Sequence, residues 1–297
     1  MIKTKELVKC FDSVKALDGI SINVKKGSVY GLVGPNGAGK TTLIKTLLGV
    51  YKQNQGEVEI DGIKDVNSEE LKQRIVYISD DLYFYPSYTI KDMAKFYKSI
   101  YKNWDEETFE KLKGIFNIDE KRKVKKLSKG MQKQVAFWLG LCTKPDIMIL
   151  DEPVDGLDPV MRRSTMKLVL SEVASRDMTV LISSHNLREL EDVCDFVGIM
   201  HKGKIVIEKA LDDIKGNIHK IQVAFKNGLP ENLSDKLEIL KCESFGSVYN
   251  IIVRGENARE VIEAYEPLVC DIIPLSLEEV FIYELGGMGY EFESIII

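Results

Sequence analysis

The residues best suited to chemistry lie in segment 34–42, which reads Gly-Pro-Asn-Gly-Ala-Gly-Lys-Thr-Thr. It matches the pattern G-x-x-x-x-G-K-[ST] of phosphate-binding loops. The apolar run Val29–Val33 precedes it, and Leu43–Leu48 follows with apolar residues at helical spacing. Glycines let backbone N–H groups curve around phosphate oxygens, and the start of a helix favours an anion. The segment therefore predicts a nucleotide site; the alternative is a glycine-rich turn that fits the pattern by chance.

Two side chains of this loop have roles that follow from the motif. Lys40 is long enough to reach the β- and γ-phosphates of a nucleotide, and the Thr41 hydroxyl is a ligand for Mg²⁺.

A second motif places two carboxylates at the end of an apolar strand, Ile147–Leu150 followed by Asp151 and Glu152. Asp151 is placed to bind Mg²⁺, and Glu152 to polarise an attacking water as general base. Taken alone, the pair is also compatible with the polar end of an ordinary strand.

A third motif lies between the other two, where Leu127-Ser-Lys-Gly-Met-Gln132 opens a helical segment. Ser128 is a good N-cap residue, so capping of the helix is an alternative explanation for this serine. The order of the three motifs resembles that of the ATP-binding cassette (ABC) family, whose signature is Leu-Ser-Gly-Gly-Gln. Segment 153–159 resembles the D-loop of that family, and His185, in Ile-Ser-Ser-His, resembles its switch histidine.

The resemblance covers residues 1 to about 212 and implies a fold. We expect an α/β P-loop cassette at 1–215, with a RecA-like mixed sheet core and a helical subdomain inserted at about 87–142. Residues 216–297 are expected to form a small C-terminal α+β accessory domain. The tract 86–105 resembles a bacterial subgroup of single-cassette export ATPases.

The residue pattern predicts the elements in more detail. We expect core strands at Val29–Val33, 74–79, 146–150, 179–183 and 197–200, the last forming a hairpin with 205–208, and helices at 89–101, 105–117 and 128–142. In the C-terminal part we expect strands at 219–225, 237–241, 248–253 and 271–274, and helices at 258–265 and 277–284, the latter opened by a capping box of Ser276 and Glu279.

The resemblance also implies how the site works. Two cassettes would pair head to tail, with ATP between the phosphate loop of one and the signature of the other. Ser128 and Gly130 would then contact the γ-phosphate held by the partner, and Asp158 would communicate across the pair. The remaining ATP-contacting residues implied by the family are Phe11 on adenine, Gly34, Asn36, Gly37, Gly39 and Lys40 around the phosphates, Thr42 at the α-phosphate and His185 at the γ-phosphate. Lys40, Glu152 and His185 form the expected catalytic set.

The sequence departs from the family at two places. Asp80 stands where most members carry a Gln; it is a possible Mg²⁺ ligand beside Thr41 and Asp151, or else an exposed loop acid. In the signature, Lys129 replaces the first Gly and Met131 the Gln. Altered signatures occur in unequal pairs, so a homodimer and a heterodimer both remain open.

Composition narrows the functional class. The chain has 297 residues and a net charge of −5, so no basic character points to nucleic acid. No apolar run approaches the ~20 residues that span a bilayer, and the first residues lack a signal-peptide pattern. The five cysteines are scattered without a C-x-x-C pair. These features predict a cytoplasmic protein.

The expected function is an ATP-binding and ATP-hydrolysing subunit of an ABC transporter. It would lie on the inner face of the cell membrane through a separate integral-membrane permease, and the accessory domain favours export. Two alternatives remain: a soluble ABC ATPase acting on nucleic acid or ribosomes, and a nucleotide-dependent regulatory module whose C-terminal domain senses a ligand. An aromatic cluster has two interpretations: most of its members would pack the helical insertion, and some, near the Asp80 loop, would line a groove for a helix of the permease. Its members are Tyr83, Phe84, Tyr85, Tyr88, Phe96, Tyr97, Tyr101 and Trp104.

Overall fold

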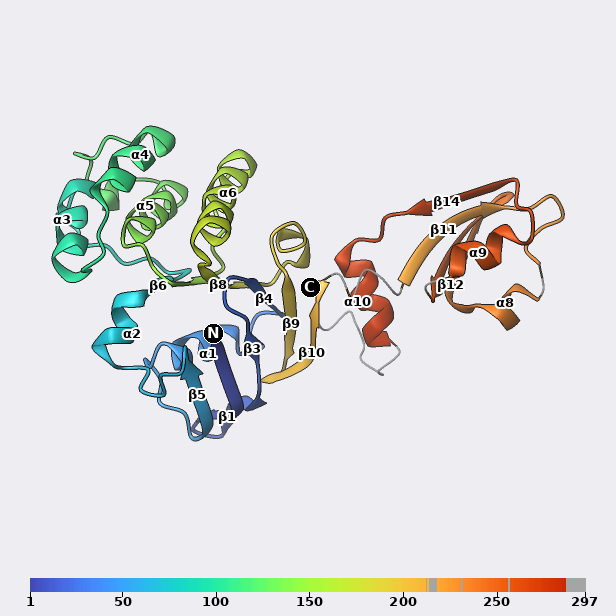
Figure 1. The fold of residues 1–297 in the computed structure, drawn as a ribbon, viewed down its shortest axis with the longest axis horizontal. Helices are drawn as coiled ribbons and strands as arrows, with labels where there is room; N and C mark the ends of the chain where they lie inside the picture. Colours follow the sequence, from blue (N-terminus) through green and yellow to red (C-terminus); the bar gives the residue numbers. More distant parts are fainter. Residues whose placement is uncertain (212, 214–217, 231, 256, 287–297) are drawn as a thin grey trace. The chain divides into compact units, whose positions relative to one another are not determined.

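The computed structural model describes residues 1–211, 213, 218–230, 232–255 and 257–286 (Figure 1). The chain forms two compact units, one from Met1–Asn186 with Val193–Glu208, the other from Leu187–Asp192 with the chain from Lys209 onward. The domain boundary expected between residues 215 and 216 lies outside the described residues.

The centre of the first unit is a six-stranded sheet in the order β10-β9-β4-β8-β7-β6. Strand β4 pairs in parallel with β8 and β9, and β7 pairs in parallel with β8 and β6. The bounds are β4 (Val29–Val33), β6 (Ile75–Ile78), β7 (Ile147–Asp151), β8 (Thr179–Ser184), β9 (Phe196–His201) and β10 (Lys204–Ala210). Every residue of β4, β7 and β8 is buried, as expected for parallel strands covered on both faces. The predicted core strands are therefore confirmed.

A second sheet of this unit is antiparallel and was not among the predicted elements. Strand β1 (Ile2–Phe11) pairs with β2 (Val14–Ile20), β3 (Asn23–Val24) and β5 (Gln55–Ile60). Its register shifts between Leu7 and Val8, and Glu6 has a positive φ of 48°. Such a bulge moves the later side chains to the other face, which breaks the alternation by which a strand is recognised.

Helix α1 (Lys40–Leu47) packs in the main core of the unit, between the two sheets. The fully buried residues of this core include Leu17, Ile20, Leu32, Leu43 and Leu47. The end of β4 and the start of α1 are thereby anchored in one apolar cluster. The loop that joins them is held at both ends by this core.

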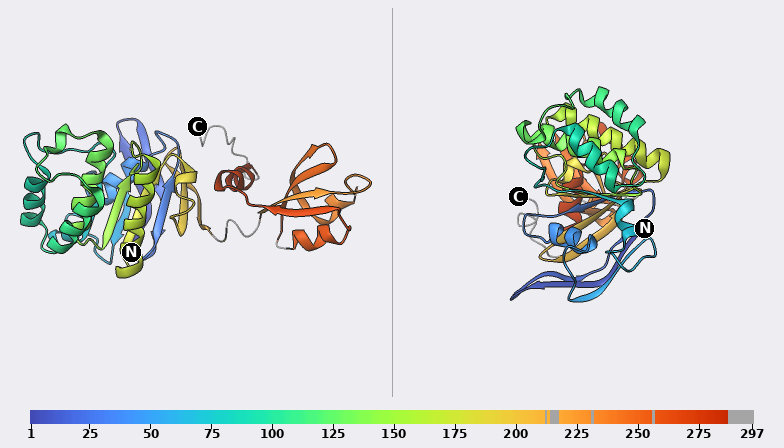
Figure 2. Two further views of the ribbon diagram at one scale, coloured as in Figure 1. Left: turned by 90° about the horizontal axis from the view of Figure 1, so that it is seen from above. Right: turned by 90° about the vertical axis from the view of Figure 1, so that its left-hand side faces the viewer.

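The helices at 89–101, 105–117 and 128–142 are confirmed as α3 (Ile90–Ile100), α4 (Glu106–Phe116) and α5 (Lys129–Cys142). Figures 1 and 2 show them grouped at one end of the first unit. Trp138 of α5 is fully buried, stacks on Phe109 at 4.8 Å between ring centroids, and donates its indole N–H to the Phe109 carbonyl. The other helical segments are α2 (Glu69–Arg74), η1 (Val124–Lys126) and α6 (Pro159–Arg176).

The second unit contains an antiparallel sheet in the order β12-β13-β11-β14. Its elements are η2 (Leu187–Glu189), β11 (Ile218–Ala224), α8 (Leu233–Lys236), β12 (Glu238–Phe245), β13 (Val248–Arg254), α9 (Ala258–Glu263), β14 (Val269–Ile273) and α10 (Leu277–Gly286). One sheet face packs Ile221, Val223, Ile251 and Val253 against apolar residues of α8 and α9. The predicted capping box is present, since Ser276 Oγ accepts from Glu279 N and Ser276 N donates to Glu279 Oε2.

None of the helices in the described part of the chain combines the length and the apolar character that crossing a membrane requires.

Candidate functional site

The loop at 34–42 leaves the buried end of β4 and enters α1, and two of its glycines cannot be replaced without movement. A Cβ on Gly34 would lie 2.2 Å from the Met200 carbonyl oxygen. Gly39 is the N-cap of α1 with φ 110°, and a Cβ there would lie 2.6 Å from the Ala16 carbonyl oxygen. The backbone therefore approaches its neighbours too closely for side chains, as a phosphate-cradling loop requires.

The loop borders a cavity of about 490 Å³. The predicted residues that line it are Asn36, Gly37, Gly39, Lys40, Thr41, Thr42, Asp80 and Glu152. Five further lining residues carry no motif and were not predicted: Val14, Lys15, Ala16, Lys202 and Gly203. They come from β2 and from the turn after β9, so only the tertiary fold brings them to the loop.

Lys40 lies along the loop rather than in solvent. It is 5% exposed, and its Nζ donates to the carbonyl oxygens of Gly34 (2.6 Å) and Pro35 (3.4 Å). The same Nζ is 3.2 Å from Glu152 Oε1. The lysine of the first motif and the second carboxylate of the second motif therefore form an ion pair.

Asp151 is buried at the end of β7, with 2% of its surface exposed. Its carboxylate accepts hydrogen bonds from the Ser183 hydroxyl of β8 and, at 3.4 Å, from the Tyr77 hydroxyl of β6. Burial and the nearby Asp151 charge raise the pKa of Tyr77. Tyr77 therefore stays protonated and remains a donor to Asp151 at neutral pH.

Glu152 adopts a left-handed backbone conformation, with φ 47°. Its N–H faces Ser183, with both the carbonyl oxygen and the hydroxyl at 3.2 Å. Its Oε2 lies 2.9 Å from His185 Nδ1 and accepts from the His185 backbone N–H at 3.3 Å. Glu152 thus stands between Lys40 and His185, and the structure brings the expected catalytic set together.

The residues expected to serve a partner chain have local roles here. Ser128 caps α5 by accepting from Met131 N at 3.2 Å, and Asp158 caps α6 by accepting from two backbone N–H groups at 3.0 Å. A Cβ on Gly130 would lie 2.6 Å from the Gly156 carbonyl oxygen. None of the three is among the residues that line the loop cavity.

Phe11 ends β1 and is 39% exposed. Its ring meets Tyr51 edge-on at 5.1 Å between centroids, and Lys9 Nζ lies 4.9 Å from its centre. It is not among the residues that line the loop cavity. Its contact with adenine stays a prediction.

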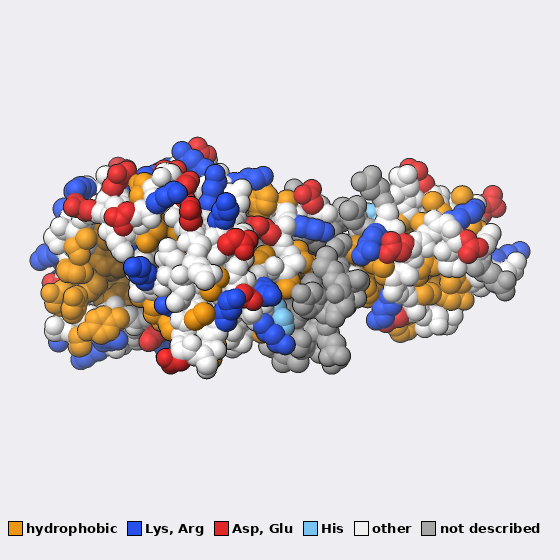
Figure 3. All heavy atoms as spheres, turned by 90° about the horizontal axis from the view of Figure 1, so that it is seen from below, with side chains coloured by type: hydrophobic (Ala, Val, Ile, Leu, Met, Phe, Trp, Pro, Cys, Tyr) orange, Lys and Arg blue, Asp and Glu red, His pale blue; other side chains and the backbone are white. Residues whose placement is uncertain are grey.

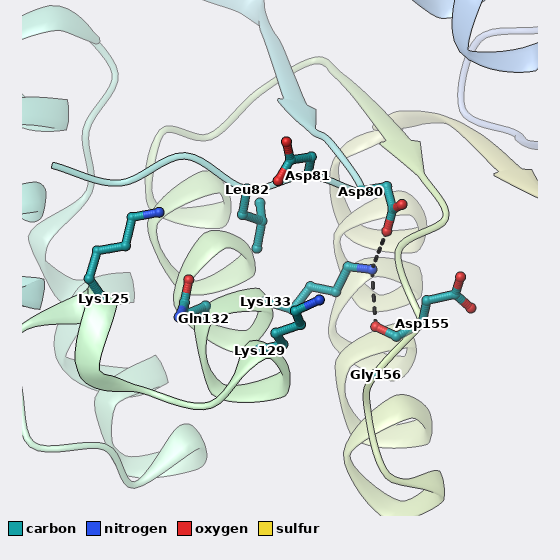
Figure 4. A pocket seen from close by; sticks show the side chains of 9 residues that line it. All are labelled: Asp80, Asp81, Leu82, Lys125, Lys129, Gln132, Lys133, Asp155 and Gly156. Atoms are coloured by element: carbon teal, nitrogen blue, oxygen red, sulfur yellow. Dashed lines mark hydrogen bonds and ion pairs between the residues drawn. The ribbon is translucent and has the colours of Figure 1, made fainter. Parts of the chain in front are cut away.

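A second cavity, of about 580 Å³, lies beside the first and shares Asp80 with it (Figure 4). Its lining includes Lys133 of α5, which is 4% exposed. The Lys133 Nζ is 3.4 Å from Asp80 Oδ1, 2.5 Å from the Glu152 carbonyl oxygen and 3.0 Å from the Asp155 carbonyl oxygen. Lys133 was not among the predicted site residues. The available signal was a lysine two positions after the last altered signature residue, just before the apolar run that begins at Val135.

Two different groups of side chains in the first unit offer ligand atoms for a metal ion. Among the described residues, the side chains that bring three ligand atoms within 4.8 Å of one another are Glu152, Asp155 and His185. The predicted set, Thr41, Asp151 and Asp80, offers one hydroxyl and two carboxylates, which are oxygen donors of the kind Mg²⁺ prefers. Asp80 is paired with Lys133 in this arrangement.

Comparisons with known proteins agree with the order of the motifs. The family model for ABC transporters matches residues 17–155. The ABC transporter ATP-binding protein YtrB of Bacillus subtilis is 31% identical over 97% of this chain and 99% of its own length. The bacitracin transport ATP-binding protein BcrA of Bacillus licheniformis is 39% identical over 72% of this chain and 71% of its own. A solved ATP-binding subunit of an ABC transporter superposes with a TM-score of 0.67 and 26% identity, over 72% of this chain and 92% of that one.

Proposed function

We propose, from the premise that this chain belongs to the ABC transporter family as an ATP-binding and ATP-hydrolysing subunit, that it closes around ATP with a second cassette. The single observation that carries the proposal is the separation of the two halves of the site. The loop cavity contains Lys40 and Glu152, whereas Ser128 and Gly130 lie outside it. This separation supports the proposal that the phosphate loop and the signature of one chain serve two different nucleotides.

Within one chain, the proposed chemistry starts from the Lys40–Glu152 pair at 3.2 Å. The phosphates of ATP compete with Glu152 for the lysine, because phosphate oxygens carry more negative charge. Glu152, released from Lys40 but still beside His185, then orients water for attack on the γ-phosphorus. His185, whose side chain is 41% exposed, is positioned to contact the γ-phosphate.

Magnesium fits this site by donor chemistry, and we assign Thr41 and Asp151 as its ligands, with Asp80 as a possible third. When bound, Mg²⁺ would neutralise charge on the β- and γ-phosphates. Ser183 and Tyr77 hold the Asp151 carboxylate in place.

Across the pair, the N-terminal end of α5 would face the γ-phosphate bound by the partner. Its free N–H groups and dipole favour an anion, and Ser128 and Gly130 lie in its first turn. Asp158, at the start of α6, would carry the state of one site to the other. A homodimer and a heterodimer both satisfy this arrangement.

The permease would dock on the aromatic surface of the helical part, where Tyr83 is 74% and Tyr85 41% exposed. These rings continue into Tyr88 and Phe96 by direct ring contacts. Figure 3 shows hydrophobic side chains gathered at the end of the first unit that carries α3. Through this contact the subunit would lie on the inner face of the cell membrane. We propose export as the direction, supported by the resemblance of tract 86–105 to export ATPases.

The test is binding of radiolabelled ATP to the purified chain, with size-exclusion chromatography in its presence and absence. We expect binding, an ATP-dependent shift toward a dimer, and loss of both in Lys40→Ala. Unchanged binding by Lys40→Ala would overturn the assignment of the loop. If both the parent and Glu152→Gln bind ATP as strict monomers, pairing with a second copy of this chain is overturned. The heterodimer would then be tested by adding a second, different cassette.

A further inference from the structure

Lys133 is a buried cation that the proposed mechanism does not use. Its side chain is 5% exposed, and buried lysines are rare unless every charge is compensated. An ammonium group has three donors, and Lys133 meets three acceptors: the carbonyl oxygens of Glu152 and Asp155 and the carboxylate of Asp80. Figure 4 shows the side chain reaching from α5 toward Asp80 and Asp155.

The three acceptors belong to separate segments. Asp80 follows β6, Glu152 follows β7, and Asp155 lies in the turn between β7 and α6. Lys133 lies on α5, the helix capped by Ser128, and therefore joins the segments that carry the general base and the D-loop. No other lysine that lines this cavity has such a set of contacts among the described residues.

The contact with Glu152 bears on catalysis because the conformation of that residue is unusual. A non-glycine residue with φ 47° persists only where its surroundings hold it. The N–H of Glu152 is held by Ser183 and its carbonyl oxygen by Lys133. With both backbone groups fixed, the side chain projects toward Lys40 and His185.

Resting on the proposed function, we propose that Lys133 is a positioning residue. It fixes the backbone of Glu152 and of the turn at 153–156, so that the general base points at the attacking water, with Asp80 as its counter-ion. The Asp80 carboxylate is 59% exposed and also lines the phosphate-loop cavity, so it can change partner, whereas the two carbonyl contacts of Lys133 are the fixed ones.

The experiment measures kcat, KM and ATP affinity for Lys133→Met, Lys133→Arg and Lys133→Gln, with Lys125→Met as the matched control. Lys125 lines the same cavity, but it is exposed and lies over the Tyr83 ring. We expect Lys133→Met to lower kcat at least tenfold while the Kd for ATP changes less than threefold. Lys133→Arg should recover part of the loss because it restores a donor and the charge. Lys125→Met should match the parent.

The double variant separates positioning from general support of the fold. If Lys133 acts through Glu152, adding Lys133→Met to Glu152→Gln should change the residual rate less than twofold, since the effect of Lys133 disappears with the base. A separate tenfold loss in that background would refute the proposal, as would a folded Lys133→Met or Lys133→Gln with the parent kcat. If Lys133→Met does not fold, Lys133→Gln serves in its place, because it keeps a polar group in the buried site while removing the charge. Absence of ATPase activity in the parent and in Lys125→Met would instead refute the proposed function.

Discussion

Replacing Glu152 by Gln tests the general-base assignment with little change of shape. The amide keeps the size of the side chain and can still meet His185, but it cannot accept a proton from water. General-base catalysis contributes about 10²- to 10⁴-fold in rate, so the barrier should rise by about 3–5 kcal/mol. We therefore expect kcat to fall by at least 100-fold in steady-state phosphate release.

The same change should not weaken ATP binding. In the parent, Lys40 pairs with Glu152 at 3.2 Å in a mostly buried setting, with side chains 6% and 12% exposed. Such a pair attracts by about 5 kcal/mol at an effective dielectric constant of 20, most of which is offset by desolvation. A net cost of about 1–2 kcal/mol for releasing Lys40 disappears in Glu152→Gln, so the Kd for ATP should fall by roughly 5- to 30-fold.

Equilibrium binding of labelled ATP measures the Kd, and size-exclusion chromatography at saturating ATP measures the oligomeric state. We expect Glu152→Gln to accumulate as an ATP-bound dimer. The matched control is Glu172→Gln, because Glu172 is also partly buried and paired, with Arg176, but lies on α6 away from the cavity. A kcat within twofold of the parent would refute the assignment. A Kd weakened more than tenfold would show that Glu152 contacts the nucleotide rather than water.

Three further predictions concern the scaffold around the site. Gly34→Ala places a Cβ against the Met200 carbonyl oxygen, so urea unfolding should show a loss of at least about 1–3 kcal/mol and ATP binding should fail; a stable variant that binds ATP would contradict the close approach. Asp105 caps α4, and its hydrogen bond to Thr108 holds the pKa of the carboxyl at about 2. Since the folded pKa is depressed, this carboxylate stabilises the protein above about pH 4 and ceases to do so as pH falls through 2. Asp105→Asn should therefore be about 1 kcal/mol less stable than the parent at pH 7, and this difference should shrink as pH falls from about 4 toward 2, measured by chemical unfolding; a difference that is constant with pH would contradict this. Trp138→Ala should cost about 3–5 kcal/mol in unfolding free energy while ATP affinity is retained, since Trp138 packs in the helical part; loss of affinity in a folded variant would show that this packing reaches the loop.

The strands that carry the site were predictable because they are buried on both faces. Such strands appear as unbroken apolar runs, and Val29–Val33 was predicted with the bounds of β4. Asp151 and Glu152 could be placed because polar residues directly follow the last apolar residue of β7. Helix caps such as Ser128 were also predictable from the sequence, because a cap depends only on a few neighbouring residues.

The remaining features depend on contacts between distant segments. The register of the N-terminal antiparallel sheet shifts within β1, and the burial of the residues of β1 does not alternate regularly, so its sequence pattern lacks a clean period. Lys133 was overlooked because a lysine in a helix normally faces solvent. Its burial follows from the approach of Asp80 and Asp155, which are 53 and 22 positions away in sequence.

The pairing of Lys40 with Glu152, and of Glu152 with His185, has a consequence for when hydrolysis can begin. Lys40 is saturated by two carbonyl oxygens and Glu152, and Glu152 by Lys40 and His185. A base held in this way is not free to orient water until a competing anion takes its lysine, because one of its carboxylate oxygens is already occupied by Lys40. ATP carries that anion, so substrate binding itself would activate the base. Completion of the site by Ser128 and Gly130 of a second cassette would then make hydrolysis conditional on two events, the arrival of nucleotide and the closure of the pair.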